Sequence, residues 1–397
     1  RLGRPGPDGA PLPDWPTLFD GIADEADRTR RTTVILVDDA HLPLGTRGAF
    51  GGFLEALWAR LRARALPVHL VLAGRGPHFE RELERSAPEL RPAAGLELTL
   101  GGLSLREVTA RVPGYSPRDR LRTWAIFGGL PERVRHLDPG VGLATNVERL
   151  LFAPGAPLLE AGLRALEGDV QSLPRYASLL GALAAGRTDW GGLRAACPDF
   201  ETGSQMAPYV GRLESLGLVD VRRSLDAGER SRNRRYEPAD PFLAFWYRFV
   251  LPVLGQVTLL APPDPWERWI SPGLDGHVAR VFPRACREWL VRHGDEALPE
   301  RARLAGGLWG PGYDLPVAGT LRNGAIVYGA CRWRGDPVDA DAFSDVGRQL
   351  RETRYGFGRE GRLRVVFSAT GFTTGARRAV GRDPLAYGVG IETIVGP

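Results

Sequence analysis

The sequence predicts a multi-domain α/β protein, and three observations lead to this prediction. The chain has 397 residues, enough for about two to three domains of ordinary size. Its apolar content of 43% and charged content of 25% are typical of a globular protein. Near its start, helical periodicity at residues 18–30 and 50–63 alternates with apolar strands at 33–37 and 68–74. Helices that alternate with strands favour a parallel sheet.

The first strand, residues 33–37, consists only of apolar or β-branched residues. Such an unbroken run is typical of a strand buried on both faces of a parallel sheet. Asp38 and Asp39 follow directly, and open α/β sheets bind ligands at the carboxyl ends of their strands. In P-loop nucleotidases an aspartate at this position binds Mg²⁺, and a second acid can polarise the attacking water. Two acids after an apolar strand also occur at ordinary loop starts, so both interpretations stay open.

The middle of the chain has the order of a winged helix. Residues 96–100 alternate in the manner of one more strand. Three helical patterns and a two-stranded hairpin come later, at residues 173–183, 190–196, 204–216, 219–223 and 235–236. The hairpin carries six arginines, which are Arg222, Arg223, Arg230, Arg232, Arg234 and Arg235. Such a cluster could bind the phosphates of duplex DNA, and a solvated hairpin that packs on a neighbouring domain fits the pattern equally well.

Five aromatic residues crowd into residues 242–249, where they could form a stacking surface. At helical spacing, however, aromatic residues are more often buried. We therefore expect a buried hinge between the winged helix and the C-terminal domain.

Several absences narrow the function classes. All 52 basic residues are arginines, so no lysine is available for a phosphate loop, a Schiff base or a nuclease site. The pattern Gly-x-x-x-x-Gly-Lys-Ser/Thr does not occur.

The opening Arg-Leu-Gly-Arg-Pro-Gly-Pro is unlike the start of a natural domain, and we expect a fragment or a shortened protein. Three scattered cysteines predict neither disulfides nor a metal site, which favours the cytoplasm. The sequence has no apolar run of about 20 residues, so we expect no membrane span.

Several segments resemble one family in their order along the chain. They are residues 34–39, 70–74, 103–107, the Gly-Gly-Leu-Pro turn at 128–131, and the run Arg-Tyr-Glu-Pro-Ala-Asp-Pro-Phe-Leu-Ala-Phe-Trp-Tyr-Arg-Phe at 235–249. Together they resemble the bacterial and archaeal P-loop ATPases, AAA+/STAND-like, that carry a C-terminal winged helix and a restriction-endonuclease-like domain. The resemblance implies that Asp38 binds Mg²⁺ and that Asp39 activates the attacking water. It also implies that Arg75 lies near the sensor 1 position.

The resemblance also implies a division of the chain. Residues 1–102 would be a partial P-loop ATPase core without its phosphate loop, and residues 103–165 a helical lid. Residues 166–250 would be the winged helix, and residues 251–397 the restriction-endonuclease-like domain.

In the last of these domains the family's nuclease residues are mostly replaced. Pro283 and Ala330 stand where the family has glutamates, and Arg332 stands for its lysine, while Asp314 retains the family's aspartate. Arginine does not deprotonate and cannot replace a tuned lysine. We expect a nuclease fold without nuclease activity, although Glu288 or Asp336 could supply a replacement acid.

The sequence thus predicts a truncated ATPase that would bind ATP and Mg²⁺ in the intact protein and is inactive alone. The alternative is a DNA-binding or protein-interaction scaffold without ATPase activity. The expected partners are ATP, duplex DNA, and other proteins or further copies of the chain, and we expect no membrane contact.

Overall fold

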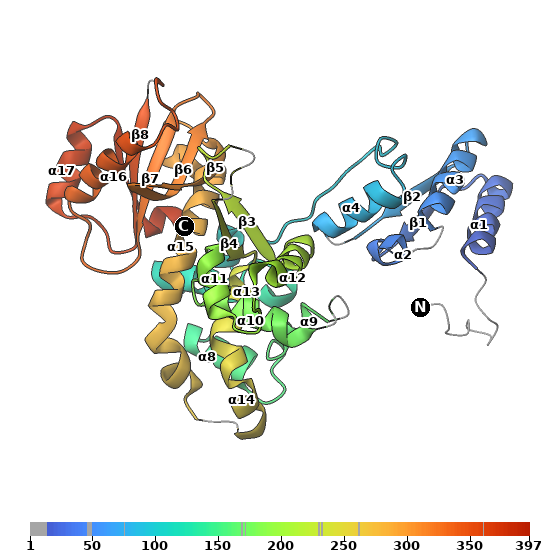
Figure 1. Cartoon of the computed structure of the whole chain (residues 1–397), viewed down its shortest axis with the longest axis horizontal. Coiled ribbons are helices and arrows are strands. Elements are labelled where there is room, and N and C mark those ends of the chain that lie inside the picture. Colours follow the sequence, from blue (N-terminus) through green and yellow to red (C-terminus); the bar gives the residue numbers. More distant parts are fainter. Residues whose placement is uncertain are drawn as a thin grey trace. The chain divides into compact units, whose positions relative to one another are not determined.

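The computed structural model describes residues 14–45, 50–74, 76–167, 170, 172–228, 231, 233–260, 263–359 and 361–397. The chain divides into two compact units (Figure 1). One contains residues 1–100 with 212–217, and the other contains residues 101–211 with 218–397. We describe each unit by itself.

The first unit has the predicted alternation of helices and strands. Its elements are α1 (Trp15–Thr29), β1 (Thr33–Val37), α2 (His41–Gly45), α3 (Phe50–Ala63), β2 (Val68–Leu72) and α4 (Gly76–Ser86). The start of α1 is fixed by Asp14, whose side chain accepts a hydrogen bond from the Thr17 N–H at 2.9 Å. The helix ends where Arg30 takes a left-handed φ of 52°. Strands β1 and β2 pair in parallel, as predicted, with Val37 opposite Leu72.

The predicted burial of β1 on both faces is wrong. Ile35 and Val37 are buried in a core with residues of α1 and α3, but Val34 and Leu36 are 62% and 64% exposed. Successive residues of a strand point to opposite faces, and the described helices of this unit pack against only one face. An apolar run therefore did not guarantee two covered faces.

The strand predicted at residues 96–100 is also wrong. The segment has no regular structure, and Leu96, Leu98 and Leu100 are 81%, 70% and 84% exposed. An alternating pattern forms a strand only when a neighbouring strand supplies hydrogen-bond partners, and no described residue does so here.

The second unit begins with short helices. They are α5 (Leu105–Thr109), α6 (Pro117–Phe127), α7 (Pro131–Val134), α8 (Leu143–Val147), the π-helical turn η1 (Glu148–Phe152) and α9 (Ala161–Arg164). A reciprocal cap starts α5: the Ser104 hydroxyl accepts from the Glu107 N–H, and the Glu107 carboxylate accepts from the Ser104 N–H at 2.7 Å.

Three helices and a hairpin follow, close to the predicted positions, and the end of the third helix, residues 212–215, is assigned to the first unit. They are α10 (Leu173–Ala184), α11 (Trp190–Ala196), α12 (Gly203–Ser215), β3 (Val219–Arg223) and β4 (Arg234–Pro238). After α12, Gly217 takes a left-handed φ of 69°, as expected for a glycine that ends a helix. Strands β3 and β4 are antiparallel, and Arg222 lies opposite Arg235.

The aromatic segment lies in the core, as predicted. It forms α13 (Pro241–Phe245) and η2 (Trp246–Val250), and its five aromatic side chains are at most 7% exposed. The Trp246 indole donates a hydrogen bond to the Leu159 carbonyl at 3.0 Å, and the Tyr247 hydroxyl donates to the Gly162 carbonyl at 2.8 Å. By length and composition, residues 241–259 could also cross a membrane, contrary to the sequence-based expectation, but half of that window is buried inside the fold.

Helices lead from the aromatic segment to the C-terminal sheet. They are η3 (Leu251–Val253), α14 (Leu254–Leu260), η4 (Trp266–Ile270), α15 (Ser271–His293) and η5 (Gly294–Glu296). The remaining elements are β5 (Ala302–Gly310), β6 (Tyr313–Leu321), β7 (Ile326–Arg332), α16 (Asp341–Glu352), β8 (Arg362–Ser368), α17 (Thr374–Arg382), β9 (Ala386–Gly390) and α18 (Ile391–Val395).

The C-terminal sheet has helices on both faces (Figure 1). Its strand order is β5-β6-β7-β8-β9, with antiparallel pairing up to β7 and parallel pairing beyond it. Phe367 meets the ring of Trp289 from α15, whereas its neighbour Val366 shares a core with Phe343 and Val346 of α16. Because neighbouring strand residues point to opposite faces, α15 and α16 cover opposite sides.

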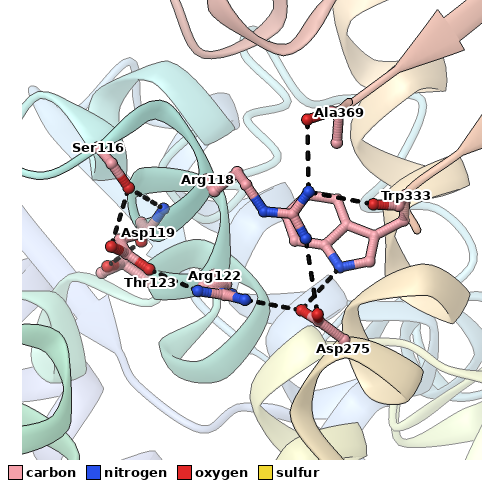
Figure 2. Close-up of polar contacts among 8 residues, drawn as sticks. All are labelled: Ser116, Arg118, Asp119, Arg122, Thr123, Asp275, Trp333 and Ala369. Atoms are coloured by element: carbon pink, nitrogen blue, oxygen red, sulfur yellow. Dashed lines mark hydrogen bonds and ion pairs between the residues drawn. The ribbon is translucent and has the colours of Figure 1, made fainter. Parts of the chain in front are cut away.

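A polar network joins α6, α15 and the residues after β7 (Figure 2). The Arg118 guanidinium lies over the buried Trp333 ring, 4.5 Å from its centroid. Asp275 accepts hydrogen bonds from the Trp333 indole at 3.1 Å and from Arg122 at 2.8 Å. One carboxylate thus links the helical segment to the C-terminal sheet.

Candidate functional site

Asp38 and Asp39 lie in the turn between β1 and α2. The Ala73 N–H donates to the Val37 carbonyl, and the Ala40 N–H donates to the Ala73 carbonyl, both at 2.9 Å, so strand pairing continues on both sides of the two acids. Asp39 has a left-handed φ of 47°, which aspartate tolerates better than most residues. Its N–H donates to the Asp38 carboxylate at 2.9 Å. Both side chains are exposed at the carboxyl end of β1.

A buried histidine lies beside these acids. His41 begins α2 and is 2% exposed, and its Nδ1 lies 3.9 Å from Asp39 Oδ1. That Nδ1 has no hydrogen-bond partner among the described residues. The ring of His78 in α4 meets His41 at 5.4 Å between centroids, and His78 Nδ1 is 4.0 Å from Glu82 Oε1. Burial and then the charge of Arg212 lower the pKa of His78, so its imidazole is neutral at pH 7.

The part of the chain that the structure describes contains no group of three or more histidine, cysteine, aspartate or glutamate side chains that could hold a metal ion. The two aspartates alone could still bind Mg²⁺ together with other ligands, because this ion commonly takes one or two carboxylates plus phosphates and water. Arg75, the other predicted nucleotide contact, lies outside the described residues.

The hairpin separates the predicted DNA-binding arginines onto two faces. Arg222 and Arg235 share one face, and Arg223 and Arg234 share the other, because directly paired residues point to the same side. Arg222 donates to Glu237 at 3.2 Å. Arg235 donates two hydrogen bonds of 2.9 Å to the carboxylate of Asp314 and lies 4.6 Å from the centroid of Trp309. Arg230 and Arg232 lie outside the described residues.

The four positions of the predicted degenerate nuclease site lie on three elements, α15, β6 and β7. Pro283 lies inside α15, and Ala330 is 4% exposed in the core between the sheet and α16. Asp314 is the second residue of β6 and its carboxylate accepts hydrogen bonds from Arg235, while Arg332 is exposed at the end of β7. The possible replacement acids are elsewhere: Glu288 accepts from the Leu105 N–H at 2.6 Å, and Asp336 is exposed in the loop after β7.

Sequence reasoning missed a second site, a cavity of about 210 Å³ in the second unit. Three of its lining residues, Arg280, Arg284 and Arg287, lie on α15. Their i, i+4, i+7 spacing places them on one face of a helix, and this signal could have been found in the sequence.

A scan against protein-family models and a search of curated proteins found no match. Solved structures show a weak likeness. A Walker-type ATPase of Pyrococcus abyssi is 17% identical with a TM-score of 0.39, over 59% of this chain and 68% of that chain. The Aeropyrum pernix ORC2 protein in ADPNP–ADP complexes is 14% identical with a TM-score of 0.36, over 61% and 69%. Its ADP form has a TM-score of 0.27 at 15% identity. These scores are low, and we draw no conclusion about fold or function from them.

Proposed function

We propose that this chain is part of an ATPase of the AAA+/STAND type, in which a nucleotide-binding unit acts on a winged helix and a nuclease-like domain without nuclease activity. One observation carries the proposal: two exposed, adjacent carboxylates at the carboxyl end of a parallel strand. Asp38 would bind Mg²⁺ between the protein and the nucleotide phosphates, and Asp39 would orient the attacking water.

Further support comes from the order of elements in the second unit. Three helices followed by a two-stranded antiparallel hairpin have the order of a winged helix. The C-terminal sheet, with α15 on one face and α16 on the other, fits an endonuclease-like domain. A cytoplasmic setting fits the free cysteines of the described chain, Cys197, Cys286 and Cys331.

The proposal is tested by Mg·ATP hydrolysis in the natural full-length protein. We expect Asp38→Asn to lower kcat by about 100-fold or more, the scale of losing one electrostatic contact to a reacting group. Asp39→Asn should lower kcat with little change in nucleotide affinity. Asp24→Asn, which alters an acid of α1 that is 73% exposed, is the matched control and should leave the rate unchanged. Wild-type hydrolysis in Asp38→Asn would show that these acids belong to an ordinary loop.

The 397-residue chain alone should bind Mg·ATP weakly, because it contains no phosphate loop and no lysine. Calorimetry measures this directly. A micromolar affinity for the chain alone would mean that other residues hold the phosphates.

A second candidate function is contact with duplex DNA or another protein without ATP hydrolysis. Arg223 and Arg234 favour it, because they lie directly opposite each other in the hairpin and pair with no carboxylate among the described residues. Unlike the ATPase, this function predicts DNA affinity that does not change with nucleotide or with Asp38→Asn.

A further inference from the structure

The cavity in the second unit lies among several structural elements and is lined by more arginines than acids. The β3–β4 hairpin, helix α15 and strands β5 and β6 all contribute to its walls. Its acidic and arginine side chains are Arg222, Arg235, Glu237, Arg280, Arg284 and Arg287. Much of the remaining lining is apolar, including Trp309, Pro283 and Pro316. The cavity therefore combines an arginine cluster with apolar walls.

The carboxylates around the cavity do not balance the arginines. Glu237 is shared, with Arg222 at 3.2 Å and Arg287 at 3.6 Å. Asp220 lies 3.2 Å from Arg284, and Asp314 binds Arg235. No carboxylate among the described residues pairs with Arg280. Five arginines against three carboxylates leave a formal surplus of two positive charges.

The arginine cluster reaches from the exposed Arg280 to a partly dehydrated place at Arg287. The Arg287 side chain is only 13% exposed, and burial together with the Arg222 charge lowers the pKa of Arg287 to about 10, so it remains charged at pH 7. His277, which also lines the cavity, is buried, and this burial lowers its pKa to about 4. It is therefore neutral at pH 7. Uncompensated charge away from water is costly, and a bound anion would offset that cost.

We propose that this cavity binds a small phosphate-bearing molecule. The planar guanidinium matches the oxygens of a phosphate group in pairs and is more weakly hydrated than an ammonium, which suits a partly buried site. The volume of about 210 Å³ is well above the roughly 10–15 Å³ that a single water needs, which leaves room for a phosphoryl group with a small substituent. Arg280 and Arg284 contact the phosphate, and the apolar walls face the substituent. The ligand joins the hairpin to α15 and the sheet.

The test is calorimetry on the whole chain with three probes: inorganic phosphate, pyrophosphate and glycerol phosphate, at constant ionic strength in chloride buffer. We expect saturable binding of at least one probe at one site per chain. Arg280→Ala and Arg284→Gln should each weaken it by about tenfold or more, since a hydrogen bond to a charged group is lost. Arg280 is exposed and pairs with no carboxylate among the described residues, so its removal should leave the fold intact. The control Arg378→Ala, on an exposed face of α17, removes the same charge and should change nothing.

The three probes separate the sources of phosphate. Tighter binding of glycerol phosphate than of phosphate shows that the apolar walls contribute, and equal binding shows that the phosphoryl group alone is recognised. Both results support the site. It is refuted if no probe saturates, or if Arg378→Ala weakens binding as much as Arg280→Ala. It is also refuted if Arg280→Ala and Arg284→Gln weaken duplex DNA binding only. The proposal does not depend on the ATPase site, and Asp38→Asn should leave this binding unchanged.

Discussion

Gly162→Ala should destabilise the second unit strongly, because the new methyl group has no space. A Cβ at this position would lie 2.1 Å from Cε3 and 2.2 Å from Cδ2 of Trp246, whereas carbon atoms pack best at about 3.5–4.0 Å. Trp246 is fully buried and cannot turn towards solvent. The ring or the backbone of α9 must therefore move.

The size of the effect follows from what that movement disturbs. Overpacking a core costs about 1–3 kcal/mol. The Trp246 and Tyr247 hydrogen bonds end on the Leu159 and Gly162 carbonyls, next to the new methyl group, and each contributes about 1 kcal/mol. We expect the free energy of unfolding to fall by about 2–5 kcal/mol.

Urea unfolding followed by near-ultraviolet circular dichroism measures this difference. The matched control is Gly181→Ala in α10, where an added Cβ has no neighbour within 4 Å. That change should stabilise by about 0.5–1 kcal/mol, since alanine favours a helix interior. If both variants unfold like the wild type, the aromatic segment does not pack against α9, and its interpretation as core is wrong.

Three further predictions concern the hairpin and the C-terminal domain. The double variant Arg223→Ala/Arg234→Ala should make the plot of log affinity for duplex DNA against log salt concentration less steep by about 2, because each lost phosphate contact removes about 0.9 from the slope. The double control Arg377→Ala/Arg378→Ala should leave that slope unchanged. The chain should not nick plasmid DNA in Mg²⁺ or Mn²⁺, and nicking that disappears in Asp314→Ala would contradict the predicted loss of the nuclease site. Burial alone would raise the pKa of Asp226, but hydrogen bonds from Ser224, Tyr313 and Thr353 hold it below its usual value. Asp226→Asn should thus destabilise the protein at pH 7, and denaturation midpoints should converge with the wild type as the pH falls below about 4.

The sequence predicted elements best where local patterns and end signals agree. Residues 50–63 and 190–196 form helices with the predicted bounds, and a glycine ends α12 where one was expected. The aromatic segment was also predicted correctly as core, because helical spacing of large apolar residues is informative without any knowledge of the partner.

Predictions failed where the outcome depends on a distant partner. Residues 96–100 have the pattern of a strand, but no described strand lies beside them. The apolar residues of β1 predicted burial on both faces of the strand, but they could not show that no described element packs on Val34 and Leu36. The arginine-lined cavity was missed for a related reason: Arg222 and Arg287 are 65 positions apart in the chain, and only the fold brings both to Glu237.

The hairpin shows how the fold can reconcile two interpretations that the sequence leaves as rivals. In the sequence its arginines form one cluster, assigned either to DNA or to packing. In an antiparallel pair, however, alternate residues point to opposite faces, so the cluster divides in two. Arg222 and Arg235 face α15 and the sheet, where they pair with Glu237 and Asp314. Arg223 and Arg234 have no such acids among the described residues. Packing on one face therefore leaves the other free for phosphate contacts, and substitutions on the two faces should separate stability from DNA affinity.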